Sequence, residues 1–105
     1  MSVSPSEAEG IGAHHRDTRR KANERKAAGA SPPTDAQGLV HFGCECTRDD
    51  CDRLVGVPLY VYRRLVDAGD QYLLQPGHHA FARYRTIVTT GSMSIEERLA
   101  EREDP

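Results

Sequence analysis

Residues 42–46 read Phe42-Gly43-Cys44-Glu45-Cys46, and this short stretch decides the fold that we expect. Cys51 follows after a polar loop, so all three cysteines of the chain lie within eight residues. An odd number of cysteines leaves one over in any disulfide scheme. In a reducing compartment, such a cluster is more often a set of metal ligands or reactive thiols than a set of disulfides. The cysteines therefore predict a metal site.

A fourth ligand is expected from residues 76–78, where a Pro-Gly turn presents His78. Three thiolates and one imidazole are a standard ligand set for structural Zn²⁺, which binds four N or S atoms in a tetrahedron. His41 and His79 are the substitutes for His78, and His41 lies only three residues before Cys44. An iron–sulfur cluster is a less common alternative for such ligands. We expect zinc, bound by Cys44, Cys46, Cys51 and His78.

The spacing of the first two cysteines also predicts local geometry. Cys44-x-Cys46 is tighter than the usual C-x2-C arrangement, so we expect a sharply turned backbone, with Gly43 supplying unusual dihedral angles. Zn²⁺ with three thiolates carries a net negative charge, which Arg48 and Arg53 are placed to balance. Four protein ligands leave no open position for water, so the site is expected to be structural. The domain should then unfold without its metal.

The composition indicates a small hydrophobic core that needs a structural metal ion for its stability. The chain has 105 residues, of which 37% are hydrophobic, and it has no Trp. Residues 1–37 contain few large apolar side chains, so we expect the compact unit, a zinc-binding α+β domain, over residues 38–90. A unit of roughly 50 residues buries a small share of its surface, and at this size a metal or a disulfide is often needed for stability. No segment resembles a signal peptide or a membrane span, which predicts a cytoplasmic protein that does not bind membranes.

Within residues 38–90 the pattern predicts short strands around one central helix. The helix is expected over 59–68, after Pro58 and before Gly69, with a buried stripe that includes Leu59, Tyr62 and Val66. Strands are expected over 39–42, 72–74 and 84–90. Residues 94–97, Ser-Ile-Glu-Glu, have the form of a capping box and predict a charged helix to about residue 103, within an acidic tail over 91–105. The predicted class is a small metal-stapled α+β fold with flexible or helical charged ends.

The first 37 residues are expected to be a disordered basic arm. Residues 17–28 are good helix formers but lack an apolar face, and an isolated helix of this length is marginal in water. We expect it to become ordered on a partner, and its removal to leave the fold intact. Residues 14–28 hold six basic residues against two acidic ones. The basic residues proposed for partner contact are Arg16, Arg19, Arg20, Lys21, Arg25 and Lys26.

Several of these motifs together resemble a family of short, uncharacterised actinobacterial proteins. The resemblance covers residues 16–88. It lies in the Cys-Glu-Cys run, in Cys51, in a Pro-Leu-x-x-Tyr helix at 58–62, in Pro-Gly-His at 76–78 followed by Ile-Val at 87–88, and in Asn-Glu-Arg at 23–25. It implies a small metal-binding domain with Cys44, Cys46, Cys51 and His78 as ligands, and it implies no activity. In the family an acidic residue commonly follows the histidine and the chain ends in a strand, whereas here His79 follows and a helix is predicted.

The function expected from these features is that of a non-enzymatic zinc-binding module, an adaptor or regulator that uses the basic arm. A protein or ribonucleoprotein partner is expected rather than a small molecule, with nucleic acid as the alternative. A thiol or metal redox switch is a second alternative, although Glu45, Asp49 and Asp50 do not favour low-pKa thiols. No catalytic motif such as H-E-x-x-H or a phosphate-binding Gly loop is present, so we do not expect an enzyme.

Overall fold

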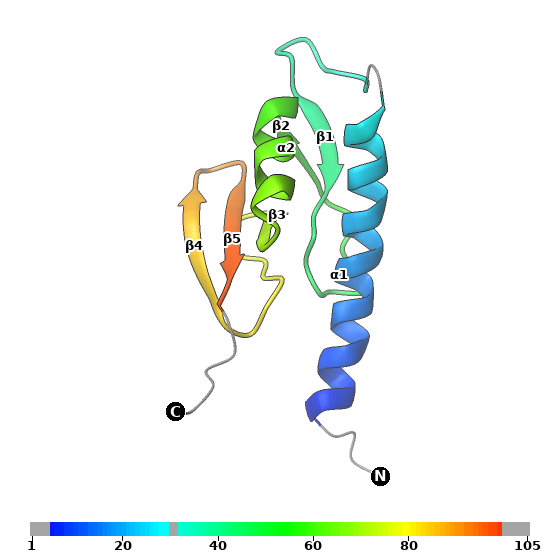
Figure 1. Cartoon of the computed structure of the whole chain (residues 1–105), viewed down its shortest axis with the longest axis vertical. Coiled ribbons are helices and arrows are strands. Elements are labelled where there is room, and N and C mark those ends of the chain that lie inside the picture. Colours follow the sequence, from blue (N-terminus) through cyan, green and yellow to red (C-terminus); the bar gives the residue numbers. More distant parts are fainter. Residues whose placement is uncertain (1–4, 30–31, 100–105) are drawn as a thin grey trace.

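The computed structural model describes residues 5–29 and 32–99 and confirms the α+β class. That part of the chain contains two helices and five strands, and the strands form two small antiparallel sheets (Figure 1). The helix α1 (Pro5–Ala28) runs along one side of the molecule, while β4 (Tyr84–Thr89) and β5 (Ser94–Arg98) lie on the opposite side. The second helix, α2 (Leu59–Ala68), lies between them and packs against α1 and against β3 (Gln71–Leu74). No helix in the described ranges is both long and apolar enough to cross a membrane.

The first sheet consists of β1 (Val40–Gly43) and β2 (Leu54–Val57). Val40 pairs with Val57 and Phe42 with Val55, and all four side chains are buried. Successive side chains of a strand point to opposite faces, so this register places the four apolar residues on one face. The sequence predicts β1 at almost its observed position. It gives no expectation for β2, a strand of only four residues that includes a glycine.

The central helix begins and ends where its flanking residues predict. Pro58 precedes α2 with extended backbone angles, and Gly69 ends the helix with a φ of 86° while its N–H donates to the carbonyl of Val66. Tyr62 and Leu65 are the buried residues of the helix. The ring of Tyr62 stacks on that of Phe42 at a centroid distance of 4.1 Å, which joins α2 to the first sheet.

The second sheet corrects the expectation for the C-terminal segment. Its strand order is β3-β5-β4, so residues 94–98 form the central strand and not the predicted helix. Ile95 is buried and lies opposite Leu73 on one side and Val88 on the other. These long-range pairings override the local capping-box signal, which is a weak preference. The expected helical residues beyond 99 lie outside the described residues.

The N-terminal helix is longer than the sequence predicts and is not a free arm. It begins at Pro5, whereas a marginal helix was expected only over 17–28. Arg20, Asn23 and Ala27 lie at i, i+3 and i+7 on one face, and all three are buried. The helix therefore has a buried stripe, but most of this stripe is polar. The expectation that nothing holds the helix fails because the core supplies hydrogen-bonding partners for that stripe.

Candidate metal centre

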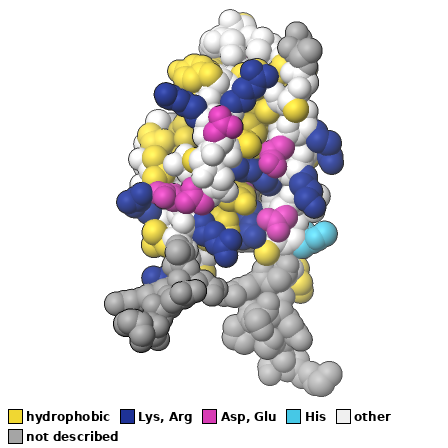
Figure 2. All heavy atoms as spheres, viewed as in Figure 1, with side chains coloured by type: hydrophobic (Ala, Val, Ile, Leu, Met, Phe, Trp, Pro, Cys, Tyr) yellow, Lys and Arg dark blue, Asp and Glu magenta, His cyan; other side chains and the backbone are white. Residues whose placement is uncertain are grey.

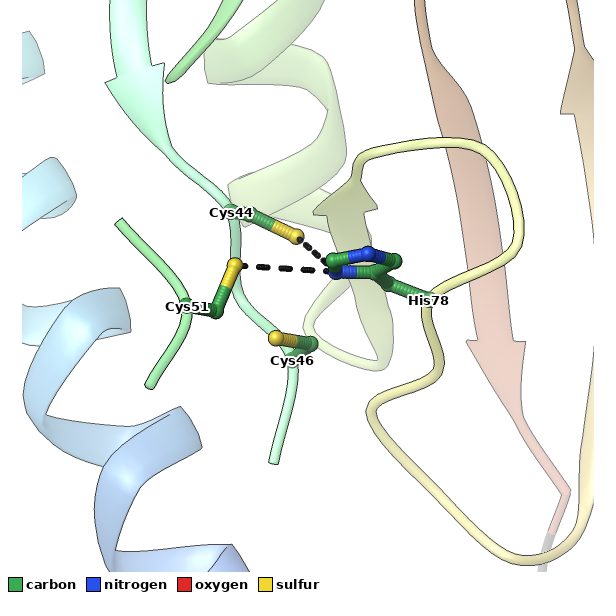
Figure 3. Close-up of side chains that lie close together, drawn as sticks. All are labelled: Cys44, Cys46, Cys51 and His78. Carbon is green, nitrogen blue, oxygen red and sulfur yellow. Dashed lines mark hydrogen bonds between the residues drawn. The ribbon is translucent and has the colours of Figure 1, made fainter. Parts of the chain in front are cut away.

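The four predicted ligands come from three separate segments and meet at one point (Figure 3). Cys44 and Cys46 follow directly after β1, Cys51 lies in the loop before β2, and His78 lies in the turn after β3. Gly77 in that turn has a φ of 85°, and the N–H of His78 donates to the carbonyl of Gln75. One ligand atom from each of the four residues lies within 4.8 Å of the other three. Residues 34 positions apart in the sequence are thus brought together.

The Cys-x-Cys segment reaches the site without a sharp turn. Gly43 belongs to β1 and is not among the glycines with positive φ, so the unusual backbone angles expected there are not used. The N–H of Cys44 donates to the carbonyl of Arg53, and the N–H of Glu45 donates to the carbonyl of Leu73. The segment therefore continues the pairing of the first sheet and then bonds to the second. Side-chain alternation along an extended chain explains how both cysteines face the site while Glu45 points away from it.

The spacing of the ligand atoms fits a tetrahedral ion. Nδ1 of His78 lies 3.6 Å from Sγ of Cys44 and 3.6 Å from Sγ of Cys51. Zn–S bonds of about 2.3 Å and Zn–N bonds of about 2.0–2.1 Å, at a tetrahedral angle, place S and N about 3.6 Å apart. All three cysteines are free thiols, with no disulfide among them. The residues present therefore suit a four-coordinate metal ion.

The surroundings of the candidate ligands affect the thiols and the imidazole differently. Burial raises the pKa of the Cys44 thiol and that of the Cys46 thiol. Burial, together with the positive charges of Arg48 and Arg53, lowers the pKa of His78 and so favours the neutral imidazole that binds metals. A bound divalent cation is the group that would hold buried thiols in the thiolate form. The backbone N–H of Gln75 already donates to Sγ of Cys44 at 3.1 Å.

The two substitute histidines have other partners. Nε2 of His41 lies 2.8 Å from the Asp35 carboxylate, and the side chain is 47% exposed. Nδ1 of His79 lies 2.8 Å from Oε1 of Glu96, and its ring stacks on Tyr84. Of the three imidazoles weighed as the fourth ligand, the structure brings His78 to the cysteines.

Glu45 has a role that the sequence did not reveal. Its side chain is fully buried, and its two carboxylate oxygens accept four hydrogen bonds. Oε1 accepts from Nη1 of Arg20 at 3.0 Å and from the N–H of Leu73 at 2.9 Å. Oε2 accepts from Nδ2 of Asn23 at 3.0 Å and from the hydroxyl of Tyr62 at 2.5 Å. The residue between the two cysteines is thus fixed by α1, α2 and β3 together.

A second buried carboxylate, that of Glu96, holds the other side of the site. Besides His79, it accepts hydrogen bonds from the N–H of Ala80 at 2.8 Å and from the N–H of Phe81 at 3.1 Å. The carbonyl of His79 in turn accepts from the N–H of Thr47, next to Cys46. Glu96 therefore anchors the loop that follows His78, and this loop bonds to the cysteine segment.

Four of the six residues of the predicted basic arm contact the rest of the chain. Arg16 donates to the carbonyl of Ala80 and lies over the Phe81 ring at 4.3 Å, while Lys26 donates to the carbonyl of His41. Arg20 binds Glu45, and Arg19 donates to the backbone of the cysteine segment. Lys26 is exposed despite its contact with His41, and so are the remaining two members, Lys21 and Arg25. The spacing of Arg16, Arg20, Asn23 and Ala27 is the sequence signal that could have revealed this inward face.

The fold and the site define a small α+β domain whose Cys3His group can hold a metal ion. Comparisons of the chain with protein-family models, with curated proteins and with solved structures found no match.

Proposed function

We propose that the protein binds one Zn²⁺ through Cys44, Cys46, Cys51 and His78 and that this ion is a structural staple. The observation that carries the proposal is the meeting of four suitable ligand atoms, from three segments, within 4.8 Å. Zinc is the metal that three thiolates and one imidazole most commonly bind in a tetrahedral structural site. The segments that it would join adjoin strands of both sheets, so binding would add directly to the folding free energy.

We propose further that the protein is not an enzyme. With four protein ligands the ion has no open position for water or substrate, which a catalytic zinc requires. The imidazole that follows His78 in the sequence, that of His79, is held by Glu96. These features support a binding module in an adaptor or regulatory role.

The partner we propose is a protein, contacted through the outward side of α1, where Lys21 and Arg25 are exposed. Nucleic acid is less well supported because four of the six arm residues contact their own chain. On the face seen in Figure 2, the described Lys and Arg side chains are interspersed with Asp and Glu and do not gather into one patch. Phosphate binding draws its affinity from clustered cations, and this face does not offer such a cluster.

The redox alternative has weaker support than zinc binding. Cys44 and Cys46 are 1% and 0% exposed, and only Cys51 is partly accessible. Redox-active cysteines are typically accessible and have a low pKa. Burial acts against both requirements at the first two positions.

The test is native mass spectrometry before and after treatment with a chelator, with far-UV circular dichroism recorded on the same samples. We expect one zinc per chain, lost together with the folded signal. His78→Ala should abolish stoichiometric zinc binding, whereas His14→Ala, which changes an exposed histidine on α1, should leave it intact. Equal zinc content in the two variants would contradict the assigned ligand set.

A further inference from the structure

Arg19 reaches from α1 into the loop that joins two of the proposed ligands. Its Nη1 donates to the carbonyl of Cys46 at 2.8 Å and lies 3.7 Å from Sγ of the same residue. Its Nη2 donates to the carbonyl of Cys51 at 3.0 Å and lies 3.5 Å from the carbonyl of Asp49. One guanidinium group therefore contacts both ends of the four-residue loop between Cys46 and Cys51.

This arrangement depends on the shape of the arginine side chain. A guanidinium is planar and presents several N–H donors in a fixed fork, whereas a lysine ammonium is a compact charge on a flexible stem. Nη1 and Nη2 hold two carbonyls in fixed positions relative to each other, and each of these carbonyls belongs to a cysteine ligand. The fork therefore sets the distance between the two ends of the loop.

The charge of Arg19 suits the proposed ion as well. Zn²⁺ with three thiolates and a neutral imidazole has a net negative charge, and N–H donors beside the sulfur atoms stabilise such centres. Arg48 and Arg53, which the sequence suggested for this role, lie near enough to influence His78. Within the described residues, Arg19 is the arginine whose N–H contacts a ligand sulfur atom.

We propose that Arg19 is a positioning residue through which α1 completes the metal centre, so that retention of the metal and docking of α1 are linked. The inference rests on the proposed zinc site. It adds that the centre is built from the helix as well as from the ligand segments. The neighbouring contacts of Arg20 and Asn23 with Glu45 fix the helix on the same Cys-x-Cys segment.

Linkage of this kind is reciprocal. If docked α1 slows the release of zinc, bound zinc must equally favour the docked helix. Because the buried face of α1 is mostly polar, the helix depends on the carbonyl and carboxylate positions that the ligand segment provides. A partner that drew α1 away from the domain would therefore weaken the hold on the metal.

The test compares full-length, zinc-loaded Arg19→Ala and Arg19→Lys with Arg25→Ala, which removes the same charge from the exposed side of α1. Zinc release to an excess of a chromogenic chelator is followed by stopped flow. We expect release to be about 10- to 100-fold faster in both Arg19 variants, the usual effect of losing a residue that orients metal ligands, and about unchanged in Arg25→Ala. Arg19→Lys keeps the charge and the helix, so it remains informative if Arg19→Ala folds poorly.

Two further readouts separate positioning from a general loss of stability. With Co²⁺ in place of zinc, the sulfur-to-metal charge-transfer band should shift in the Arg19 variants, because an N–H donor beside Cys46 Sγ is lost. Amide hydrogen exchange of residues 11–28 should become faster in zinc-loaded Arg19→Ala than in Arg25→Ala. Release rates, band position and exchange that match those of Arg25→Ala would overturn this inference alone. A wild-type chain that takes up no metal would overturn the proposed function and this inference with it.

Discussion

The hydroxyl of Tyr62 donates a 2.5 Å hydrogen bond to the carboxylate of Glu45, the residue between the first two proposed cysteine ligands. Tyr62 lies on the central helix and also stacks on Phe42, just before the Cys-x-Cys segment. The core and the proposed metal centre are therefore connected through one buried acid. Because Arg20 and Asn23 bind the same carboxylate, the N-terminal helix belongs to this connection.

Neutralising Glu45 should destabilise the domain strongly. In Glu45→Gln, one of the two carboxylate oxygens becomes an NH₂ group that faces two hydrogen-bond donors. The buried Arg20 also loses its buried counter-ion and keeps only the partly exposed Glu24, at 3.7 Å. Breaking a buried ion pair in this way typically costs about 3–5 kcal/mol. Urea unfolding of the zinc-loaded protein measures this loss.

The matched control is Glu97→Gln, which removes the same charge from a pair with an Arg85 side chain that is 65% exposed. An exposed ion pair contributes about 0–1 kcal/mol, so this variant should unfold almost like the wild type. Equal unfolding midpoints for the two variants would show that Glu45 does not hold the centre.

Tyr62 should not ionise while the domain is folded. Burial, followed by the negative charge of Glu45, raises the pKa of Tyr62. Its pKa in the unfolded chain is about 10, so its contribution to stability is complete below about pH 10 and is lost as the pH rises above that value. In an alkaline titration of phenolate absorbance, the wild type and Tyr62→Phe should coincide until the domain unfolds. A wild-type curve with one extra phenolate before unfolding would contradict the buried position of Tyr62.

Two substitutions of Glu96, Glu96→Ala and Glu96→Gln, should lower the stability of the domain by different amounts. Glu96→Ala leaves the N–H groups of Ala80 and Phe81 without their acceptor, at a cost of about 1–3 kcal/mol for each buried unpaired group. Glu96→Gln keeps an oxygen that can accept from both, so it should lose much less stability. Thermal unfolding of the two zinc-loaded variants distinguishes these outcomes. Equal losses would mean that the charge of Glu96, and not its acceptor oxygen, anchors the loop after His78.

Removing the N-terminal helix should now damage the fold, contrary to the expectation from the sequence. A chain without residues 1–28 loses Arg20 and Asn23, and Glu45 keeps two of its four donors. We expect the zinc-loaded truncated chain to unfold at a lower urea concentration than the full chain. The control is Lys21→Ala with Arg25→Ala in the full chain, since both side chains are exposed. A truncated chain as stable as this control would show that the N-terminal segment is an arm independent of the fold, as the sequence predicted.

The sequence predicted the parts of this fold that depend on local signals. The central helix was evident from Pro58, Gly69 and apolar spacing, and the candidate ligand set was evident from clustered cysteines and a Pro-Gly-His turn. His78 was preferred from the sequence, with His41 and His79 as substitutes, but the choice could not be checked there because it depends on which loop the second sheet brings to Cys44. Only the three-dimensional structure gives the distance from each of these imidazoles to the cysteines.

The missed features all depend on partners far away in the sequence. The docked face of α1 has helical spacing but polar side chains, and such a face indicates burial only when a buried acid such as Glu45 is known to lie opposite. The strand at 94–98 was read as a helix because Ser94 and Glu97 satisfy a local rule, whereas its pairing with β3 and β4 is non-local. Glu45 itself looked like a charge that disfavours thiolates, and only its four donors give it a structural role.

X-ray absorption at the zinc K-edge of the purified full-length protein tests the central claim most directly, because it reports the atoms bound to the metal. Three sulfur ligands at about 2.3 Å and one nitrogen at about 2.0–2.1 Å would confirm the Cys3His staple. A first shell without sulfur, or one in which an oxygen takes the place of His78, would contradict it.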